Sequence, residues 1–248
     1  MRRRMIGAIL ALLAPLGAHA APMDSFARID QINRASLVMT AETGIVPRAL
    51  AATIARALDQ VAADAAKPGA ERPDDYLRIE PLITAIAGPE ATRMHSGRSR
   101  QDIIPTVLKL EQRDRLLALA QALDETRGAL LAVADREADT IVPAYTHGVQ
   151  AQPTTLGHLY LGYAAVLARD AQRLREAWAR LNLSPLGAAA LGTSSFPVDR
   201  KRLAELLGFD APVENSYDAG QLAPMDMGLE LTGLSATLAT TAGSFAQD

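Results

Sequence analysis

The strongest constraint on the fold is an apolar stripe that recurs at helical spacing from Leu156 to Leu181. Steps of three, four and seven residues place its members on one face of a long α-helix: Leu156, Leu159, Tyr160, Tyr163, Val166, Leu167, Leu174, Trp178 and Leu181. The segment after residue 101 shows the same spacing in Ile103, Val107, Leu110 and Leu117. Long amphipathic helices bury their apolar faces against one another, so the sequence predicts an all-α fold built on a helical bundle.

The rest of the chain also has helical periodicity, and no segment alternates convincingly as a strand would. We expect helices over approximately residues 25–41, 46–66, 74–88, 101–138, 154–181, 199–207 and 221 to the end. Proline, glycine and small residues mark the loops expected at 67–73, 88–99, 140–152 and 182–198. Pro47 and Pro105 fall in expected first turns, where a missing N–H costs little.

The first twenty residues have the organisation of a secretory signal peptide. Three arginines at 2–4 precede an apolar stretch at 5–17, and Ala18-His19-Ala20 forms a cleavage site of small residues. An amphipathic first helix is the alternative, but residues 6–16 are apolar on every face. We therefore expect cleavage after Ala20 and a periplasmic or secreted mature protein.

Composition excludes several classes of function. The net charge is −3 and no polybasic run occurs, so neither nucleic acid nor a membrane surface is expected as a partner of the mature chain. The chain has no cysteine, and only three histidines would follow the signal peptide. His95, His147 and His158 lack metal-ligand spacing, so we predict no metal site and no cofactor. His158 falls inside an expected helix and is interpreted as a packed or surface residue.

Two polar blocks about fifty positions apart carry the functional information. They read HSGRSRQD at 95–102 and YTHGVQAQP at 145–153. With SPLGAAALGTSSFPVDRKRLAELLGF at 184–209 and ENSYDA at 214–219, they form four ordered blocks, which are more specific than any single short motif. From residue 75 to 248 the chain resembles the N-terminal half of the argininosuccinate lyases, in the fumarase and aspartase superfamily, whereas the match at 21–72 is looser.

The resemblance implies a fold, a reaction and an assembly. It implies an N-terminal helical domain at 21–98 and, at 99–248, the truncated start of the long central bundle of the fumarase/aspartase fold. The implied reaction is a β-elimination that cleaves a C–N bond of an N-substituted aspartate and releases fumarate. The implied partners are a small dicarboxylate or N-substituted aspartate substrate and three further copies of the chain, in a homotetramer with composite active sites.

The resemblance also assigns site residues. His147 matches the histidine that acts as acid or proton relay at the leaving group, and Thr146 matches a hydroxyl that binds a carboxylate. The matched substrate-binding positions are Ser99, Arg100, Gln101, Gln152 and His95. Asp102 starts the next helix as its expected N-cap. Fixed hydroxyl, amide and guanidinium donors are what a site that stabilises extra negative charge requires.

Several of these residues also have a purely structural interpretation. His147 could cap the helix expected near Thr154, and His95 could either touch substrate or only order its loop. Arg98 and Arg100 could be loop cations that pair with carboxylates, and we expect the structural role for Arg98. Ser194-Ser195-Phe196-Pro197 superficially resembles the family's catalytic Gly-Ser-Ser-x-Met-Pro-x-Lys-x-Asn loop but lacks its spacer, lysine and asparagine, so we interpret it as a turn.

The apolar stripe of the last helix still continues at Asp248, without a glycine cap. We therefore expect the chain to be a fragment that lacks the family's catalytic serine loop and is inactive alone. Three departures from the family obscure the substrate. The family's Ser-Arg-Asn-Asp reads Ser-Arg-Gln-Asp at 99–102, and its Asp-Ala-x-x-Asp-Arg-Asp reads DAGQLAP at 218–224. Most argininosuccinate lyases also lack a signal peptide. Two non-enzymatic alternatives are a periplasmic helical binding protein derived from the lyase fold and a solute-binding protein, although the latter are usually α/β.

Overall fold

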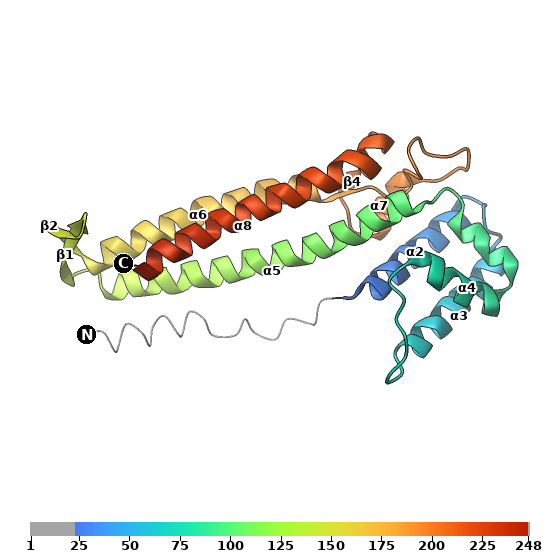
Figure 1. The fold of residues 1–248 in the computed structure, drawn as a ribbon, viewed down its shortest axis with the longest axis horizontal. Helices are drawn as coiled ribbons and strands as arrows, with labels where there is room; N and C mark the ends of the chain where they lie inside the picture. The colour runs from blue at the N-terminus through green and yellow to red at the C-terminus, as the bar shows by residue number, and fades with distance from the viewer. Residues whose placement is uncertain (1–22, 248) are drawn as a thin grey trace. The chain divides into compact units, whose positions relative to one another are not determined.

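The computed structural model describes residues 23–247 and has the predicted all-α architecture. Figure 1 shows long helices and a small β-hairpin; the strands form two two-stranded sheets. The α-helices are α2 (Ser25–Glu42), α3 (Arg48–Ala65), α4 (Tyr76–Ala87), α5 (Arg100–Arg136), α6 (Leu156–Leu181), α7 (Arg200–Leu206) and α8 (Ala223–Gln247). A 3₁₀ helix, η1 (Pro89–His95), and a π-helical turn, η2 (Asp218–Leu222), complete the helical elements. Each predicted helix is present, with ends within about two residues of the expected ones.

Contacts divide the chain into two compact units. The larger unit comprises the described part of residues 21–114 together with 179–228, and the smaller unit comprises 115–178 and the described part of 229–248. The division predicted at residue 98 stays a prediction, and the proposed signal peptide at 1–20 lies outside the described residues. Within residues 23–247, no helix is long and apolar enough to cross a bilayer.

Local chemistry explains where the helices of the larger unit begin. The side chain of Asp24 accepts a hydrogen bond from the N–H of Ala27 at 3.0 Å, and Asp75 accepts from Leu77 at 3.0 Å, so both cap helix N-termini. Pro47 precedes α3, where its fixed φ suits a helix start. Gly88 ends α4 with a φ of +84°, a conformation that favours glycine.

Two apolar clusters form the core of the larger unit. The first packs α2, α3, α4 and η1 together and includes Ile54, Leu58, Ile83 and Met94, all at most 1% exposed. The second packs α2, the start of α5 and α7 together through Ile32, Ile103, Leu110, Leu203 and Phe209. Val107, near the start of α5, packs against both clusters, so buried side chains support the loop that precedes α5.

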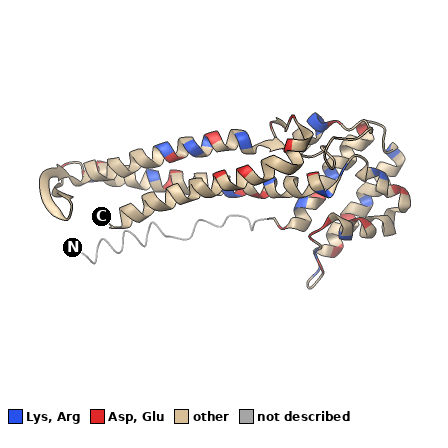
Figure 2. Cartoon of the chain, turned by 45° about the horizontal axis from the view of Figure 1, so that its top comes forward, with Lys and Arg blue, Asp and Glu red and all other residues tan. Residues whose placement is uncertain are grey.

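The smaller unit is mostly helical. Within it, the segments of α5, α6 and α8 that belong to residues 115–178 and 229–247 lie side by side (Figure 1). Leu116, Leu123 and Leu130 are buried at heptad spacing on α5. Phe245 of α8 contacts Tyr163 of α6 edge-on, with ring centroids 5.0 Å apart. No charged residue occurs from Leu231 to Gln247, so the end of α8 carries no charge colour in Figure 2.

The absence of strands was a wrong prediction. Strands β1 (Ile141–Thr146) and β2 (Val149–Thr155) form an antiparallel hairpin in a segment expected to be a loop. Two-residue strands β3 (Leu183–Ser184) and β4 (Ala211–Pro212) pair in parallel. Both faces of the hairpin are largely solvent-exposed, so its sequence lacks the apolar alternation by which a half-buried strand is recognised.

Candidate functional site

The loop before α5 is held by a reciprocal cap. Ile103 donates its backbone N–H to the carbonyl of Ser99 at 3.0 Å, which makes Ser99 the N-cap residue. The hydroxyl oxygen of Ser99 accepts from the N–H of Gln101 at 3.3 Å, and the carboxylate of Asp102 accepts from the N–H of Ser99 at 2.8 Å. The prediction of Asp102 as the N-cap was therefore wrong, because Ser99 holds that position. Asp102 is the third helical residue and completes a capping box.

Asp102 also fixes a second loop. Its other carboxylate oxygen accepts hydrogen bonds from the N–H groups of Gly187 at 2.9 Å and Ala189 at 3.0 Å. The side chain is fully buried. Burial raises the pKa of Asp102 to about 6, although the backbone donors and the nearby Arg98 favour its charged form.

Gly97 allows these two loops to pack tightly. Its φ is +73°, and a Cβ added there would lie 2.5 Å from Cγ2 of Val198 and 2.9 Å from Oγ of Ser194. The segment that contains Ser194 and Val198 therefore packs directly against the 95–102 block.

Arg98, within the 95–102 block, contacts α2 and has a structural role. Its guanidinium donates to Oγ of Ser36 at 2.8 Å and to Oδ1 of Asn33 at 3.0 Å, both on α2. Burial lowers the pKa of Arg98 to about 10. The partners are a hydroxyl and an amide, whereas the sequence suggested carboxylates.

His95 lies against the same guanidinium. Its ring nitrogen contacts Arg98, and its ring centroid lies 5.6 Å from that of Tyr76. Burial, together with the positive charge of Arg98, lowers the pKa of His95 to about 2, so its imidazole is neutral at physiological pH. Nε2 lies 3.6 Å from a carboxylate oxygen of Glu80. These contacts order the loop, which is one of the two roles expected for His95.

Arg100 and Gln101 lie on the exposed side of the first turn of α5. Arg100 pairs with Asp75, the N-cap of α4, at 2.9 Å. The backbone carbonyl of Gln101 would bond to the N–H of residue 105 in a regular helix, but Pro105 has none. The backbone of Gly220 in η2 approaches this carbonyl so closely that a Cβ there would lie 3.2 Å away.

The π-helical turn η2 was not predicted from the sequence. π-helical turns are rare and occur frequently at functional sites. Asn215 begins this one, because its side-chain oxygen accepts from the N–H groups of Tyr217 at 2.9 Å and Asp218 at 3.0 Å. Gly220, the residue directly after the ENSYDA block, therefore lies close to the backbone of Gln101, which the spacing of the blocks alone did not reveal.

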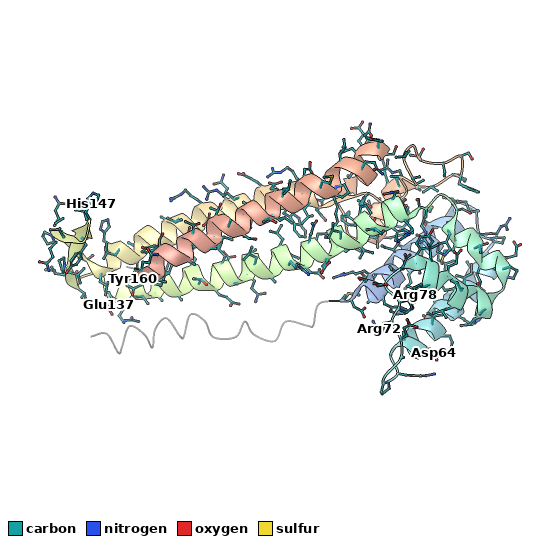
Figure 3. The ribbon with its side chains drawn as sticks, in the orientation of Figure 1. Asp64, Arg72, Arg78, Glu137, His147 and Tyr160 are labelled. Carbon is teal, nitrogen blue, oxygen red and sulfur yellow. The ribbon has the colours of Figure 1, made fainter. Side chains whose placement is uncertain are left out.

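The second block forms the hairpin. Thr146 pairs with Val149, and His147 and Gly148 form the two-residue turn, with φ of +49° and +76°. Two positive values are typical of a type I′ turn. Gln152 pairs with Ala144, and a bulge at the next step leaves Ala151 unpaired. Figure 3 shows His147 at the exposed tip of the hairpin.

The alternative role of His147 as a helix cap is contradicted. The hydroxyl of Thr155 accepts the backbone N–H of His158 at 3.2 Å and so caps α6. His158 is exposed and bonds to the hydroxyl of Thr154 at 2.8 Å. His147, in the turn between β1 and β2, therefore does not cap α6.

The predicted site residues divide between the two units. His95, Ser99, Arg100 and Gln101 belong to the larger unit, whereas the residues of the hairpin belong to the smaller one: Thr146, His147 and Gln152. The first group offers a helix N-terminus, a hydroxyl, an amide and a guanidinium, all suited to a carboxylate. The second offers an exposed imidazole suited to proton transfer and a hydroxyl suited to binding a carboxylate. Among residues 23–247, no group of His, Cys, Asp and Glu could hold a metal ion.

Comparison with known proteins identifies the family of the chain. A family model described as Lyase matches residues 30–248. The argininosuccinate lyase of Natronomonas pharaonis is 41% identical over 217 residues, which cover 88% of this chain and 44% of that protein. The argininosuccinate lyase of Burkholderia vietnamiensis is 42% identical over 175 residues, which cover 71% and 37%. The chain thus spans less than half the length of the curated relatives it matches.

Solved structures show the same relationship. EDDS lyase in complex with formate superposes with a TM-score of 0.85 at 35% identity, covering 92% of this chain and 46% of that one. The β-carboxy-cis,cis-muconate cycloisomerase of Acinetobacter calcoaceticus shares the fold, with a TM-score of 0.75 at 20% identity over 90% and 54% of the chains. The chain therefore belongs to the lyase family, as an argininosuccinate lyase-like member of the fumarate lyase superfamily.

Proposed function

We propose that the whole protein is a carbon–nitrogen lyase that cleaves an N-substituted aspartate by β-elimination and releases fumarate. The observation that supports this most is the 41% identity to an argininosuccinate lyase, over a region that includes both polar blocks. The geometry is consistent with it, because Ser99 and Gln101 stand at the N-terminus of a long helix, where an anion is stabilised.

In the proposed reaction, a base removes the proton from the carbon next to one substrate carboxylate. The resulting aci-carboxylate then expels the nitrogen, which takes up a proton as the C–N bond breaks and the C=C bond of fumarate forms. Ser99, Gln101 and Thr146 bind the carboxylates, and Gln152 orients the substrate. His147 supplies the proton to the leaving nitrogen. The resemblance assigns the base to a serine loop of the relatives outside the matched region.

We propose that these residues meet in a homotetramer, each site taking groups from more than one subunit. The support is the resemblance to the argininosuccinate lyases, which implies a homotetramer with composite active sites. Because the chain spans less than half the length of its relatives, the proposal concerns the whole protein, and this chain alone is expected to be inactive.

Argininosuccinate and EDDS are the two substrates to test first. The curated relatives are argininosuccinate lyases, whereas the solved structure with a TM-score of 0.85 is an EDDS lyase. Gln101 places one more methylene before its amide than the family's asparagine. A change of this size alters selectivity by about tenfold to 200-fold. The proposed substrate is therefore a relative of argininosuccinate with a different nitrogen substituent.

The test is fumarate release by the full-length protein, followed by its ultraviolet absorbance, with each substrate in turn. Turnover that falls about a hundredfold in Ser99→Ala but not in Ser96→Ala, a serine of the same loop, would support the proposal. Binding of succinate without turnover of either substrate would instead indicate the alternative of a non-catalytic binding protein.

We also propose that the protein is exported to the periplasm and cleaved after Ala20. The support is the arrangement of residues 1–20, with arginines followed by an apolar stretch and a small-residue site. Mass spectrometry of the protein from its natural host should find Ala21 as the first residue. An intact N-terminus in the cytoplasm would contradict the proposal.

A further inference from the structure

Arg100 places a positive charge at the first position of a long helix, α5. The N-terminus of a helix already carries partial positive charge, so a guanidinium in the first turn is electrostatically unfavourable. Arg100 nevertheless stands directly between Ser99 and Gln101, and its side chain is 52% exposed. The residue therefore costs the helix stability unless an anion lies nearby.

Asp75 supplies such an anion. Nη2 of Arg100 lies 2.9 Å from Oδ2 of Asp75. The other carboxylate oxygen, Oδ1, accepts a hydrogen bond from the backbone N–H of Leu77 at 3.0 Å and so caps α4. The two oxygens of Asp75 thus have different partners: one fixes the carboxylate to a helix end, and the other binds the guanidinium.

Both residues of this pair stand at the ends of firmly packed helices in the larger unit. Ile79 and Ile83 anchor α4 in the first apolar cluster, where they are 3% and 1% exposed. Ile103 anchors the start of α5 in the second cluster and is 2% exposed. The side chain of Asp75 is itself only 27% exposed, so it can hold the more exposed guanidinium in a defined place.

The main effect of the pair is to orient Arg100. An exposed ion pair adds little to the stability of a protein. A guanidinium has five N–H donors in a planar fork, and a carboxylate can accept two of them side by side. Half of the Arg100 side chain remains exposed to solvent, so a ligand can reach it. An untethered arginine loses rotamer freedom when it binds a ligand, whereas a tethered one has already lost it.

We propose that Asp75 is a positioning residue, which holds the guanidinium of Arg100 ready to bind a substrate carboxylate beside Ser99 and Gln101. Asp75 acts through Arg100 and does not itself touch the substrate. The inference rests on the proposed function, which supplies the dicarboxylate.

The test uses the full-length protein and two measurements: KM and kcat for fumarate release from argininosuccinate and from EDDS, and the dissociation constant of succinate by isothermal titration calorimetry. Asp75→Asn removes the charge but keeps the helix cap, since asparagine caps as well as aspartate does. KM and the succinate dissociation constant should rise about threefold to tenfold, because the untethered arginine must be ordered on binding. The value of kcat should stay within about twofold, as expected when ground state and transition state lose the same interaction. Asp74→Asn, which changes the neighbouring exposed carboxylate, should alter none of these values.

A double-mutant cycle separates positioning from a structural role. Arg100→Gln should raise KM about tenfold or more, because a charge-assisted hydrogen bond is lost. Arg93→Gln, at an arginine of η1 whose side chain is 49% exposed, is the matched control and should not. In the Arg100→Gln background, Asp75→Asn should have no further effect. An equal effect of Asp75→Asn with and without Arg100 would overturn the proposal. A lower KM in Asp75→Asn would also overturn it, because the acid would then compete with the substrate for Arg100.

Failure of the lyase function can be told apart from failure of this inference. Succinate that binds without release of fumarate contradicts only the proposed elimination, and the succinate dissociation constants of the variants still decide the role of Asp75. A crystal structure of the full-length Asp75→Asn variant tests the tether without any ligand, since the guanidinium of Arg100 should leave the N-cap of α4. The proposal is overturned if the guanidinium keeps its place, or if the unmodified protein binds no succinate at millimolar concentration.

Discussion

Asp102 accepts a hydrogen bond of 2.9 Å from the backbone N–H of Gly187, which lies 85 positions further along the chain. The same carboxylate caps the loop that presents Ser99. One buried side chain thus fixes both the substrate-binding loop proposed at 95–102 and the loop that packs on it. Disturbing Asp102 should therefore change stability and loop geometry together.

Replacing Asp102 with alanine should destabilise the protein strongly. The N–H groups of Ser99, Gly187 and Ala189 would lose their acceptor. Each buried unpaired donor costs about 1–3 kcal/mol, so the total should be about 3 kcal/mol or more. Denaturant unfolding measures the loss. Asp74→Asn, at an exposed position of the same unit, should unfold like the original chain; an equal loss in both would contradict the role of Asp102.

Asp102 also predicts a pH dependence. Burial raises its pKa from 3.8 to about 6, so the native state holds the proton more tightly than the unfolded chain does. The stabilisation is fully present below pH 3.8 and is lost as the pH rises through about 6, a change of about 3 kcal/mol. The free energy of unfolding, measured between pH 4 and 7, should show this slope, and Asp102→Asn should remove it. A slope unchanged in the variant would exclude Asp102 as its source.

Gly97→Ala should be more harmful than Gly69→Ala. Both glycines have a φ near +74°, but a Cβ at 97 would meet Val198 and Ser194, whereas one at 69 would meet nothing within 4 Å. The left-handed conformation costs about 1–2 kcal/mol at each position, and overpacking adds about 1–3 kcal/mol at 97. Melting temperatures of the two variants make the comparison. Equal shifts would mean that the loop at 194–198 moves away freely.

His147→Asn should separate the chemistry of His147 from its structural role. Asn-Gly is the preferred sequence for the turn that His147 and Gly148 form, so the hairpin should persist. If His147 protonates the leaving nitrogen, kcat of the full-length protein should fall by about two to four orders of magnitude. His158→Asn, which changes an exposed histidine on α6, is the matched control. Unchanged turnover in His147→Asn would refute its proposed role.

Gln101→Asn should shift substrate preference. It restores the shorter amide that the argininosuccinate lyases carry in this loop, at an exposed position. The ratio of kcat/KM for argininosuccinate to that for EDDS should rise by about tenfold or more. A ratio that stays constant would show that the amide does not contact the variable part of the substrate.

The helices could be predicted closely because their signals are local. Asp24, Asp75 and Gly88 mark helix ends through short-range chemistry, and the stripe from Leu156 to Leu181 fixes the period of α6. The hairpin could not be predicted from the sequence in the same way. Pro143 and Pro153 face each other in the two strands, and proline is usually a sign against a strand. The one usable signal was the turn-forming pair His147-Gly148.

The contacts around the site depend on tertiary structure, and sequence alone did not reveal them. The capping box at Ser99 and Asp102 follows from spacing, but the bond from Asp102 to Gly187 joins distant segments. The close approach of Gly220 to the carbonyl of Gln101 likewise depends on a π-helical turn. Residue types at the site were therefore predictable from the resemblance, whereas their supports were not.

The exposed hairpin has a consequence for motion. Tyr145 and Val149 are 62% and 65% exposed, so the strands depend mainly on their own ladder and on the bond between Gln150 and the hydroxyl of Tyr145 at 3.1 Å. A two-stranded ribbon alone is only marginally stable in water. Its amide hydrogens should exchange through local opening while those of α5 and α6 remain protected. The imidazole of His147 would then change position on a faster timescale than the helices unfold.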